Sequence, residues 1–254
     1  MLKIIYNLIC NIYSIYFTFF ENFFLKKKIL KKSNLEKKGF DIIKSISNPD
    51  IKLFDTTETL ENNKYMKKKI LAENNIYKLV NHFFIKNKFY LEISKLTGFN
   101  YSIDFMLYYQ TFSIPDNLKN QEWYANNWHR DKPFSKNALK VIIPLKDINT
   151  KDDGGIKVLS LFQSSEFKKK KKIDKNFFTM IAKKYDVLLF KPNLCFHKAG
   201  NPKNSYVREQ LMFQLNPSRN WCVNSNIFYK QKYLEPKFPK FSYFNDKKIF
   251  LNNL

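Results

Sequence analysis

The order of hydrophobic and polar positions along the chain changes at about residue 100. Before that point apolar residues recur at three- and four-residue steps over 56–69 and again over 75–96, which predicts helices. A short helix that begins at Asn34 is expected to turn through Gly39 into an extended segment, because glycine tolerates the left-handed backbone that ends many helices. The segment 33–100 is therefore predicted to be mainly helical.

From residue 101 to residue 217 the pattern is that of β-strands. Short runs of β-branched and aromatic residues alternate with turn signals built from Gly, Asp, Asn and Pro. Such a series is typical of a sandwich or jelly roll. We expect a mainly β domain over 33–254, with N-terminal helices, a jelly-roll core at 101–217 and an aromatic tail at 218–254 that either forms a lid or packs on the core. The expected strands cover 101–112, 138–146, 156–161, 185–190, 194–198 and 206–215.

The first 32 residues form a separate segment. Their start is an otherwise apolar helix that carries one polar stripe, followed by a lysine-rich stretch. A membrane-spanning helix has little reason to carry such a stripe. A signal-peptide cleavage site favours small residues, yet the first glycine of the chain is Gly39 and the first alanine is Ala72. Two interpretations stay open: 1–32 packs on its own domain or a partner, which we prefer, or it makes peripheral contact with a membrane interface. The stripe consists of Asn7, Asn11, Ser14, Thr18 and Asn22.

The formal net charge of +23 raises the question of a nucleic-acid partner. The lysines are spread along the whole chain, and only three of the 45 basic residues are arginines, the type that dominates base recognition and bidentate phosphate contacts. We therefore expect no specific nucleic-acid partner, and we expect the lysine run 168–172 to be a solvated loop. Three cysteines without metal-ligand spacing, Cys10, Cys195 and Cys222, indicate a reducing compartment, so the cytoplasm is the expected location.

The candidate chemistry begins with His129 and Asp131. Two residues apart on a strand, they would point to the same face. A hydrogen-bonded structural histidine is the ordinary alternative for such a pair. The chain has only three histidines, however, and a second one, His197, lies on a later predicted strand, which favours a metal site. Two imidazoles and one carboxylate make the facial triad that suits Fe(II) and leaves coordination positions open. The third histidine, His82, is expected to be structural.

Arg208 is expected on the strand that follows His197, so that both can face one cavity. An arginine suits a carboxylate clamp, because its planar donors match a carboxylate in pairs. Tyr108, Gln110 and Trp128 are candidate pocket residues from their positions near the first strands, although each could equally belong to the sheet core.

In these segments the chain resembles the phytanoyl-CoA dioxygenase family of Fe(II)- and 2-oxoglutarate-dependent oxygenases. The similarity spans 35–217. One departure is that the Pro-Gly-Ser-His-like segment usual in the family does not follow the turn at Gly155. This departure puts substrate contacts in that loop in doubt. The motifs are Glu-Lys-Lys-Gly-Phe at 36–40, Trp-His-Arg-Asp at 128–131, Leu-Lys-Val-Ile-Ile-Pro-Leu-Lys-Asp at 139–147, Asp-Val-Leu-Leu-Phe at 186–190, and then His197, Asn201 and Arg208.

The resemblance implies a double-stranded β-helix with helices outside it, and a set of roles. His129, Asp131 and His197 would bind Fe(II). The co-substrate 2-oxoglutarate would chelate the metal with its far carboxylate on Arg208, and O2 would take the last position, with release of succinate and carbon dioxide. Related halogenases lack the carboxylate ligand, so the presence of Asp131 favours hydroxylation or a related oxidation.

The sequence indicates neither the substrate nor the oligomeric state. A small molecule or a lipid- or sugar-linked metabolite is the expected substrate class. Two other functions stay open: a jelly-roll module that binds without catalysis, and a basic protein that binds membranes peripherally through 1–32 and its lysines.

Overall fold

Two antiparallel pairings at the centre of a nine-stranded sheet organise the protein. The structure, a computed structural model, describes residues 2–27, 33–44, 47–49, 51–131, 135–170, 172, 176–203, 205–230 and 248–250. In the large sheet β10 (Arg208–Ser218) lies between β4 (Asn100–Thr111) and β5 (Leu139–Pro144). The order continues through β8 (Val187–Phe190) to β1 (Phe40–Ile43) on one side, and through β11 (Cys222–Asn224) to β12 (Lys248–Phe250) on the other.

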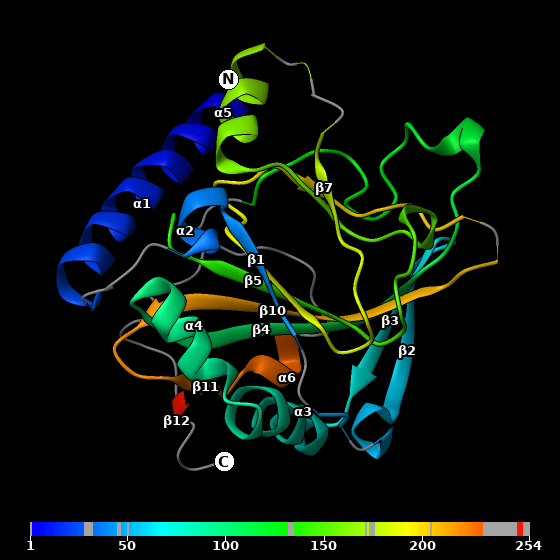
Figure 1. The fold of residues 1–254 in the computed structure, drawn as a ribbon, viewed down its shortest axis with the longest axis horizontal. Helices are drawn as coiled ribbons and strands as arrows, with labels where there is room; N and C mark the ends of the chain where they lie inside the picture. Colours follow the sequence, from blue (N-terminus) through cyan, green and yellow to red (C-terminus); the bar gives the residue numbers. More distant parts are fainter. Residues whose placement is uncertain are drawn as a thin grey trace.

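Helices cover one face of this sheet. Figure 1 shows α3 (Glu73–Val80), α4 (Phe89–Thr97) and α6 (Ile227–Lys230) on the same side of the β4 and β10 pair. A π-helix over Asn81–Lys86 joins α3 to α4. Apolar residues at helical spacing face the sheet, as the pattern over 75–96 predicts. The fully buried side chains of this layer include Leu79, Phe83, Phe84, Ile93 and, from the sheet, Phe213.

A second, smaller sheet covers the opposite face. It consists of β7 (Phe178–Thr179), β6 (Lys157–Val158) and β9 (His197–Lys198). Val158 and Met180 from this side pack in one cluster with Ile142, Leu188 and Phe190 of the large sheet. Two facing, mostly antiparallel sheets with helices outside are the predicted jelly roll, or double-stranded β-helix, and this fold class is confirmed.

The helix predicted over 56–69 is wrong. These residues form a hairpin of β2 (Thr56–Asn63) and β3 (Met66–Leu71), and β3 pairs with β4. Alternate residues of β3 are buried, which is the period of a strand. Backbone pairing with the edge of β4 supplies hydrogen bonds that local sequence does not reveal, so tertiary context decided the conformation.

The lysine run 168–172 was expected to be a solvated loop. Lys168, Lys169 and Lys170 are the last residues of α5 (Leu161–Lys170), not part of a loop. They are favoured there because cations complement the carboxyl end of a helix, and Glu166 pairs with Lys170 one turn later at 2.5 Å.

The start of the aromatic tail packs on the core through Trp221, whereas 231–247 and 251–254 lie outside the described residues.

The helix predicted at the N-terminus is α1 (Leu2–Phe24), which runs along one side of the domain (Figure 1). Only part of its polar stripe faces the domain: Ser14 is buried, and Thr18 Oγ1 accepts a hydrogen bond from the Lys136 backbone N–H, whereas Asn11 and Asn22 are exposed. On the same side of the helix the Asn137 side chain donates to Glu21. Within the part of the chain that the structure describes, no helix is both long and apolar enough to cross a membrane. Residues 28–32 of the lysine-rich stretch lie outside the described part.

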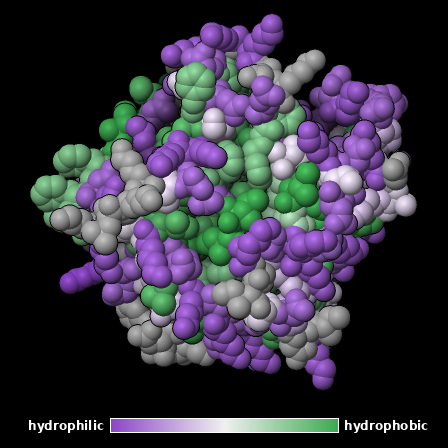
Figure 2. All heavy atoms as spheres, in the orientation of Figure 1, coloured by the Kyte–Doolittle hydropathy of each residue, from purple (hydrophilic) through white to green (hydrophobic). Residues whose placement is uncertain are grey.

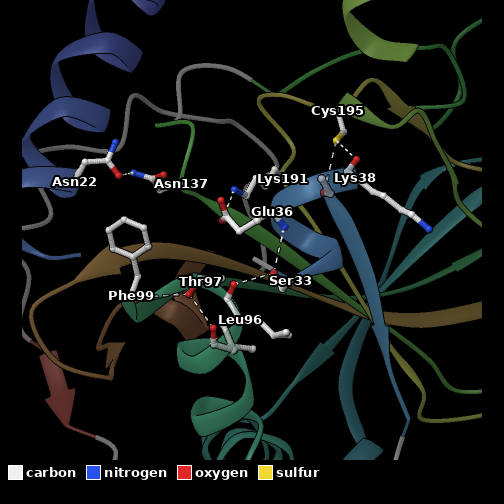
Figure 3. A network of polar contacts seen from close by, with 12 residues as sticks. Asn22, Ser33, Glu36, Lys38, Leu96, Thr97, Phe99, Asn137, Lys191 and Cys195 are labelled. Atoms are coloured by element: carbon white, nitrogen blue, oxygen red, sulfur yellow. Dashed lines mark hydrogen bonds and ion pairs between the residues drawn. The ribbon is translucent and has the colours of Figure 1, made fainter. Parts of the chain in front are cut away.

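A group of polar contacts ties α2 (Asn34–Lys38) to the loop that leads into β9 (Figure 3). Glu36 forms an ion pair of 2.7 Å with Lys191, and the Cys195 thiol lies against the Lys38 and Gly39 carbonyls. Gly39 ends α2 with φ of 86°, as the sequence predicts, and its backbone N–H donates to the Leu35 carbonyl. There is no room for a side chain at this glycine.

Gly39→Ala is expected to destabilise the protein by about 2–4 kcal/mol. The left-handed backbone strains an alanine, and the new methyl group would overlap Cys195 Sγ and Leu161. Urea unfolding followed by circular dichroism measures the change. In a Cys195→Ala background the same substitution should cost less, and an equal cost in both backgrounds would disprove the steric part of this explanation.

Candidate metal centre

A backbone bridge brings His129 and His197 together. The His129 N–H donates to the His197 carbonyl at 3.1 Å, and the His197 N–H donates to the His129 carbonyl at 2.9 Å. The two rings then lie side by side, with centroids 4.4 Å apart. His129 was expected on a regular strand. It stands instead in an isolated β-bridge, because it is the only residue of 128–131 that pairs with β9. Asp131 nevertheless lies close to both histidine side chains.

Backbone carbonyls orient both imidazoles. Nδ1 of His129 lies 2.8 Å from the Asn127 carbonyl oxygen, and Nδ1 of His197 lies 3.0 Å from that of Cys195. Each Nδ1 therefore carries the proton and donates it, which leaves the lone pair on Nε2. Both Nε2 atoms point toward Asp131, whose Oδ1 is 3.6 Å from His129 Nε2 and 3.5 Å from His197 Nε2.

Lys140 holds the other oxygen of Asp131. Its ammonium lies 2.5 Å from Oδ2, and both side chains are mostly buried. Burial acts to raise the pKa of the Asp131 carboxyl, but Lys140 and the two histidines outweigh burial, so this pKa is lowered. Burial, together with the nearby His197, lowers the pKa of His129. At neutral pH the site therefore presents a carboxylate and a neutral imidazole, the forms that bind a metal.

The donor set fits a divalent transition metal. One ligand atom from each of His129, Asp131 and His197 can be chosen so that all lie within 4.8 Å of one another. Nε2 of His197 is buried and has no hydrogen-bond partner among the described residues, which is costly for a polar atom unless a ligand satisfies it. Two imidazoles and one carboxylate are the facial triad of non-haem Fe(II) sites, in which the remaining positions stay open.

His129 and His197 line a cavity of about 360 Å³ that is also lined by Arg208. This arginine, the first residue of β10, is 1% exposed, and its Nη1 donates to the Gly154 carbonyl at 2.7 Å. Its Nε and Nη2 are buried without hydrogen-bond partners among the described residues. The guanidinium also lies over the ring of Tyr124. Two free donors on a planar cation are what a carboxylate needs for a paired contact.

The side chains expected at the pocket from β4 lie on its other face. Tyr108 packs in the core beneath the helices, and its hydroxyl donates to Glu209 at 2.5 Å. Because successive residues of a strand alternate, Gln110 shares the face of Tyr108, and the cavity is lined by Tyr109 instead. Trp128 is also absent from the lining: its ring meets Phe177 edge-on and carries the Lys198 ammonium over its face. These three pocket assignments are corrected.

Sequence reasoning missed several cavity residues. Lys140 was detectable, because it is the one polar side chain inside the apolar strand 139–145, at a position that alternates with the core residues Val141 and Ile143. Tyr109 and Gln210, whose side chains hydrogen-bond to each other, required the register between β4 and β10. The other lining residues that sequence reasoning missed include Trp123, Tyr124, Ile142 and Met212.

Comparison with known proteins agrees with the fold. No family model matches the chain, and no curated protein matches it in sequence. Among solved structures, the non-heme alpha-ketoglutarate-dependent epimerase SnoN from nogalamycin biosynthesis superposes with a TM-score of 0.54 at 13% identity, over 73% of this chain and 80% of SnoN. EctD from S. alaskensis, solved with 2-oxoglutarate and 5-hydroxyectoine, superposes with a TM-score of 0.50 at 13% identity, over 76% of this chain and 83% of EctD. The protein therefore has the double-stranded β-helix fold of these enzymes.

Anaerobic addition of Fe(II) is expected to stabilise the protein. Metal at about 100 times its dissociation constant adds about 2.7 kcal/mol, which corresponds to roughly 5–10 °C in Tm for a chain of this size. His129→Ala should abolish the shift, whereas His82→Ala, which removes a histidine outside the triad, should keep it. Differential scanning fluorimetry measures the shift, and an equal shift in His129→Ala would contradict the site.

Lys140→Met is expected to weaken metal binding by about 10–100-fold, because the partner that orients the Asp131 carboxylate is lost. Lys146→Met is the matched control, since Lys146 also pairs with an acid, Glu209, outside the triad. Isothermal titration with Fe(II) under anaerobic conditions compares the variants. Tighter binding by Lys140→Met would mean that the ammonium competes with the metal instead of positioning its ligand.

Proposed function

We propose that this protein is an Fe(II)- and 2-oxoglutarate-dependent oxygenase that oxidises a small-molecule substrate. The observation that carries the proposal is Arg208, a buried cation with two unused donors in the same cavity as the His129 and His197 imidazoles. A buried guanidinium costs free energy unless an anion pairs with it. Among the described residues no carboxylate forms an ion pair with Arg208, so the anion is expected from a ligand.

2-Oxoglutarate satisfies both halves of the site with one molecule. Its keto acid end offers two oxygen ligands for the open metal positions, and its far carboxylate matches the Nε and Nη2 donors of Arg208. When bound, the metal and co-substrate supply the oxidising chemistry, which consumes O2 and releases succinate and carbon dioxide. The solved relatives support this choice, since SnoN is described as alpha-ketoglutarate dependent and EctD was solved with 2-oxoglutarate.

The protein side chains then have positioning roles. His129, Asp131 and His197 hold the metal, and Lys140 keeps Asp131 Oδ2 engaged so that Oδ1 faces the metal. Apolar side chains such as Ile142 and Met212 line the cavity and exclude water from it. Tyr109 and Gln210 are the polar groups that can orient the substrate.

The finer proposal concerns the reaction and its substrate. Asp131 occupies the carboxylate position that the resemblance to the phytanoyl-CoA dioxygenases assigns to iron, which favours hydroxylation over halogenation. The remaining lining is mainly apolar, with aromatic rings from Trp123 and Tyr124, and it favours a substrate with an apolar portion. A small molecule or a lipid- or sugar-linked metabolite meets this description.

Anaerobic titration with Fe(II) and 2-oxoglutarate is expected to produce the weak visible charge-transfer band of the chelated metal. His129→Ala should lose the band. Arg208→Lys should raise the Kd of 2-oxoglutarate by about 10–100-fold, because a single ammonium cannot replace a paired contact worth about 1.5–3 kcal/mol. Arg219→Lys is the matched control, since Arg219 is exposed and outside the cavity.

Succinate release in air tests catalysis against binding alone. The proposed oxygenase should form succinate from 2-oxoglutarate in an iron-dependent reaction, and a matching substrate should accelerate it. A normal charge-transfer band without succinate under a broad substrate screen would instead identify a jelly-roll module that binds these ligands without catalysis. No band in the folded native protein would contradict the proposed function.

A further inference from the structure

The helix α1 shows its apolar side to solvent. Thirteen large hydrophobic side chains are exposed in the part of the chain that the structure describes, and ten of them belong to this one helix. Figure 2 shows green side chains gathered at the edge of the molecule where α1 lies in Figure 1. An apolar patch of this kind on an otherwise polar protein marks a contact surface. We call it the α1 face: Ile5, Tyr6, Leu8, Ile9, Ile12, Ile15, Tyr16, Phe19, Phe23 and Phe24.

The opposite side of α1 packs on the domain through both apolar and polar side chains, and Cys10 and Phe17 are buried on it. Ser14 and Glu21 are buried there, and Asn193 and Asn137 donate hydrogen bonds to them at 3.4 Å and 3.0 Å. A helix that only covers its own core keeps its large apolar side chains inward, whereas ten of those of α1 stay exposed. Because the domain holds the side that carries Ser14, Phe17 and Glu21, the orientation of α1 is specific and the exposed apolar side is left for another partner.

The charges around the α1 face favour an anionic surface. Glu21, the only acidic residue of α1, is buried at 1% exposure. Exposed lysines stand beside the helix: Lys26 and Lys27 follow its last turn, and Lys136 lies next to Thr18. A second copy of the chain would bring the same lysines and the same net charge of +23, which opposes self-association.

We propose that the α1 face docks into the interface of a lipid bilayer that contains anionic lipids. The helix would lie flat, with its apolar side chains among the acyl chains and the flanking lysines at the lipid headgroups. The domain would remain in water, held by the buried side of α1. This arrangement agrees with the finding that none of the described helices can cross a membrane. It does not depend on the metal site.

Co-sedimentation of the full chain with vesicles tests the proposal. One set contains phosphatidylcholine with about 30% phosphatidylglycerol, and the other contains phosphatidylcholine alone. The native protein is expected to bind the anionic vesicles, with an affinity that falls as salt rises from about 0.1 M to about 0.5 M. The variant Ile12→Ser/Phe19→Ser/Phe23→Ser should bind at least about tenfold more weakly, because three exposed members of the α1 face become polar.

Ile181→Ser is the matched control, since Ile181 is an exposed apolar residue outside α1. It should bind like the native protein, and circular dichroism establishes that both variants are folded. Failure of the native protein to sediment with anionic vesicles, or equal binding by the triple variant, would overturn the proposal. So would a native dimer in sedimentation velocity that the triple variant converts to a monomer without any vesicle binding. The charge-transfer band measured on the same samples reports the metal site separately.

Discussion

The antiparallel pairing of β4 with β10 is the constraint on which both the core and the cavity depend. The two strands pair from Arg208 opposite Thr111 to Ser218 opposite Asn100. Alternation along β10 sends Leu211 and Phe213 to the helices and sends Arg208 toward the cavity. A shift of one residue would bury the wrong set of side chains on both faces, so the free energy of the core also fixes the position of the buried guanidinium.

Two parts of the molecule contradict the usual rules of a stable fold, and each contradiction has a ligand as its simplest explanation. In the cavity, His197 Nε2 and two donors of Arg208 are buried without hydrogen-bond partners in the described part of the chain, which lowers stability until a metal and an anion supply the missing bonds. On the surface, α1 exposes its apolar side although burying it would be favourable. Both sites give up free energy of folding for the isolated chain and regain it on binding.

Some of this could be predicted from residue types and local spacing alone. Histidine is scarce in the chain, so the positions of His129 and His197 were informative. Arginine is equally scarce, so the position of Arg208 was informative as well. The helix that ends at Gly39 and the helical segment 75–96 follow from local spacing. Strand pairing could not be predicted in this way. The segment 56–69 was predicted as a helix because its apolar spacing fits the period of a helix as well as that of a strand, and contact with β4 favoured the hairpin.

The sequence by itself determined the class of fold, the identity of the candidate metal ligands and the presence of an amphipathic first helix, because these follow from residue types and from spacing along one element. Tertiary structure decided which side of each element faces which environment. It placed Tyr109 at the cavity in place of Tyr108, paired Lys140 with Asp131, and turned Ser14 and Thr18 of α1 toward the domain. Register, bridges and helix orientation depend on contacts between residues far apart in the chain, and local patterns carry no information about those contacts.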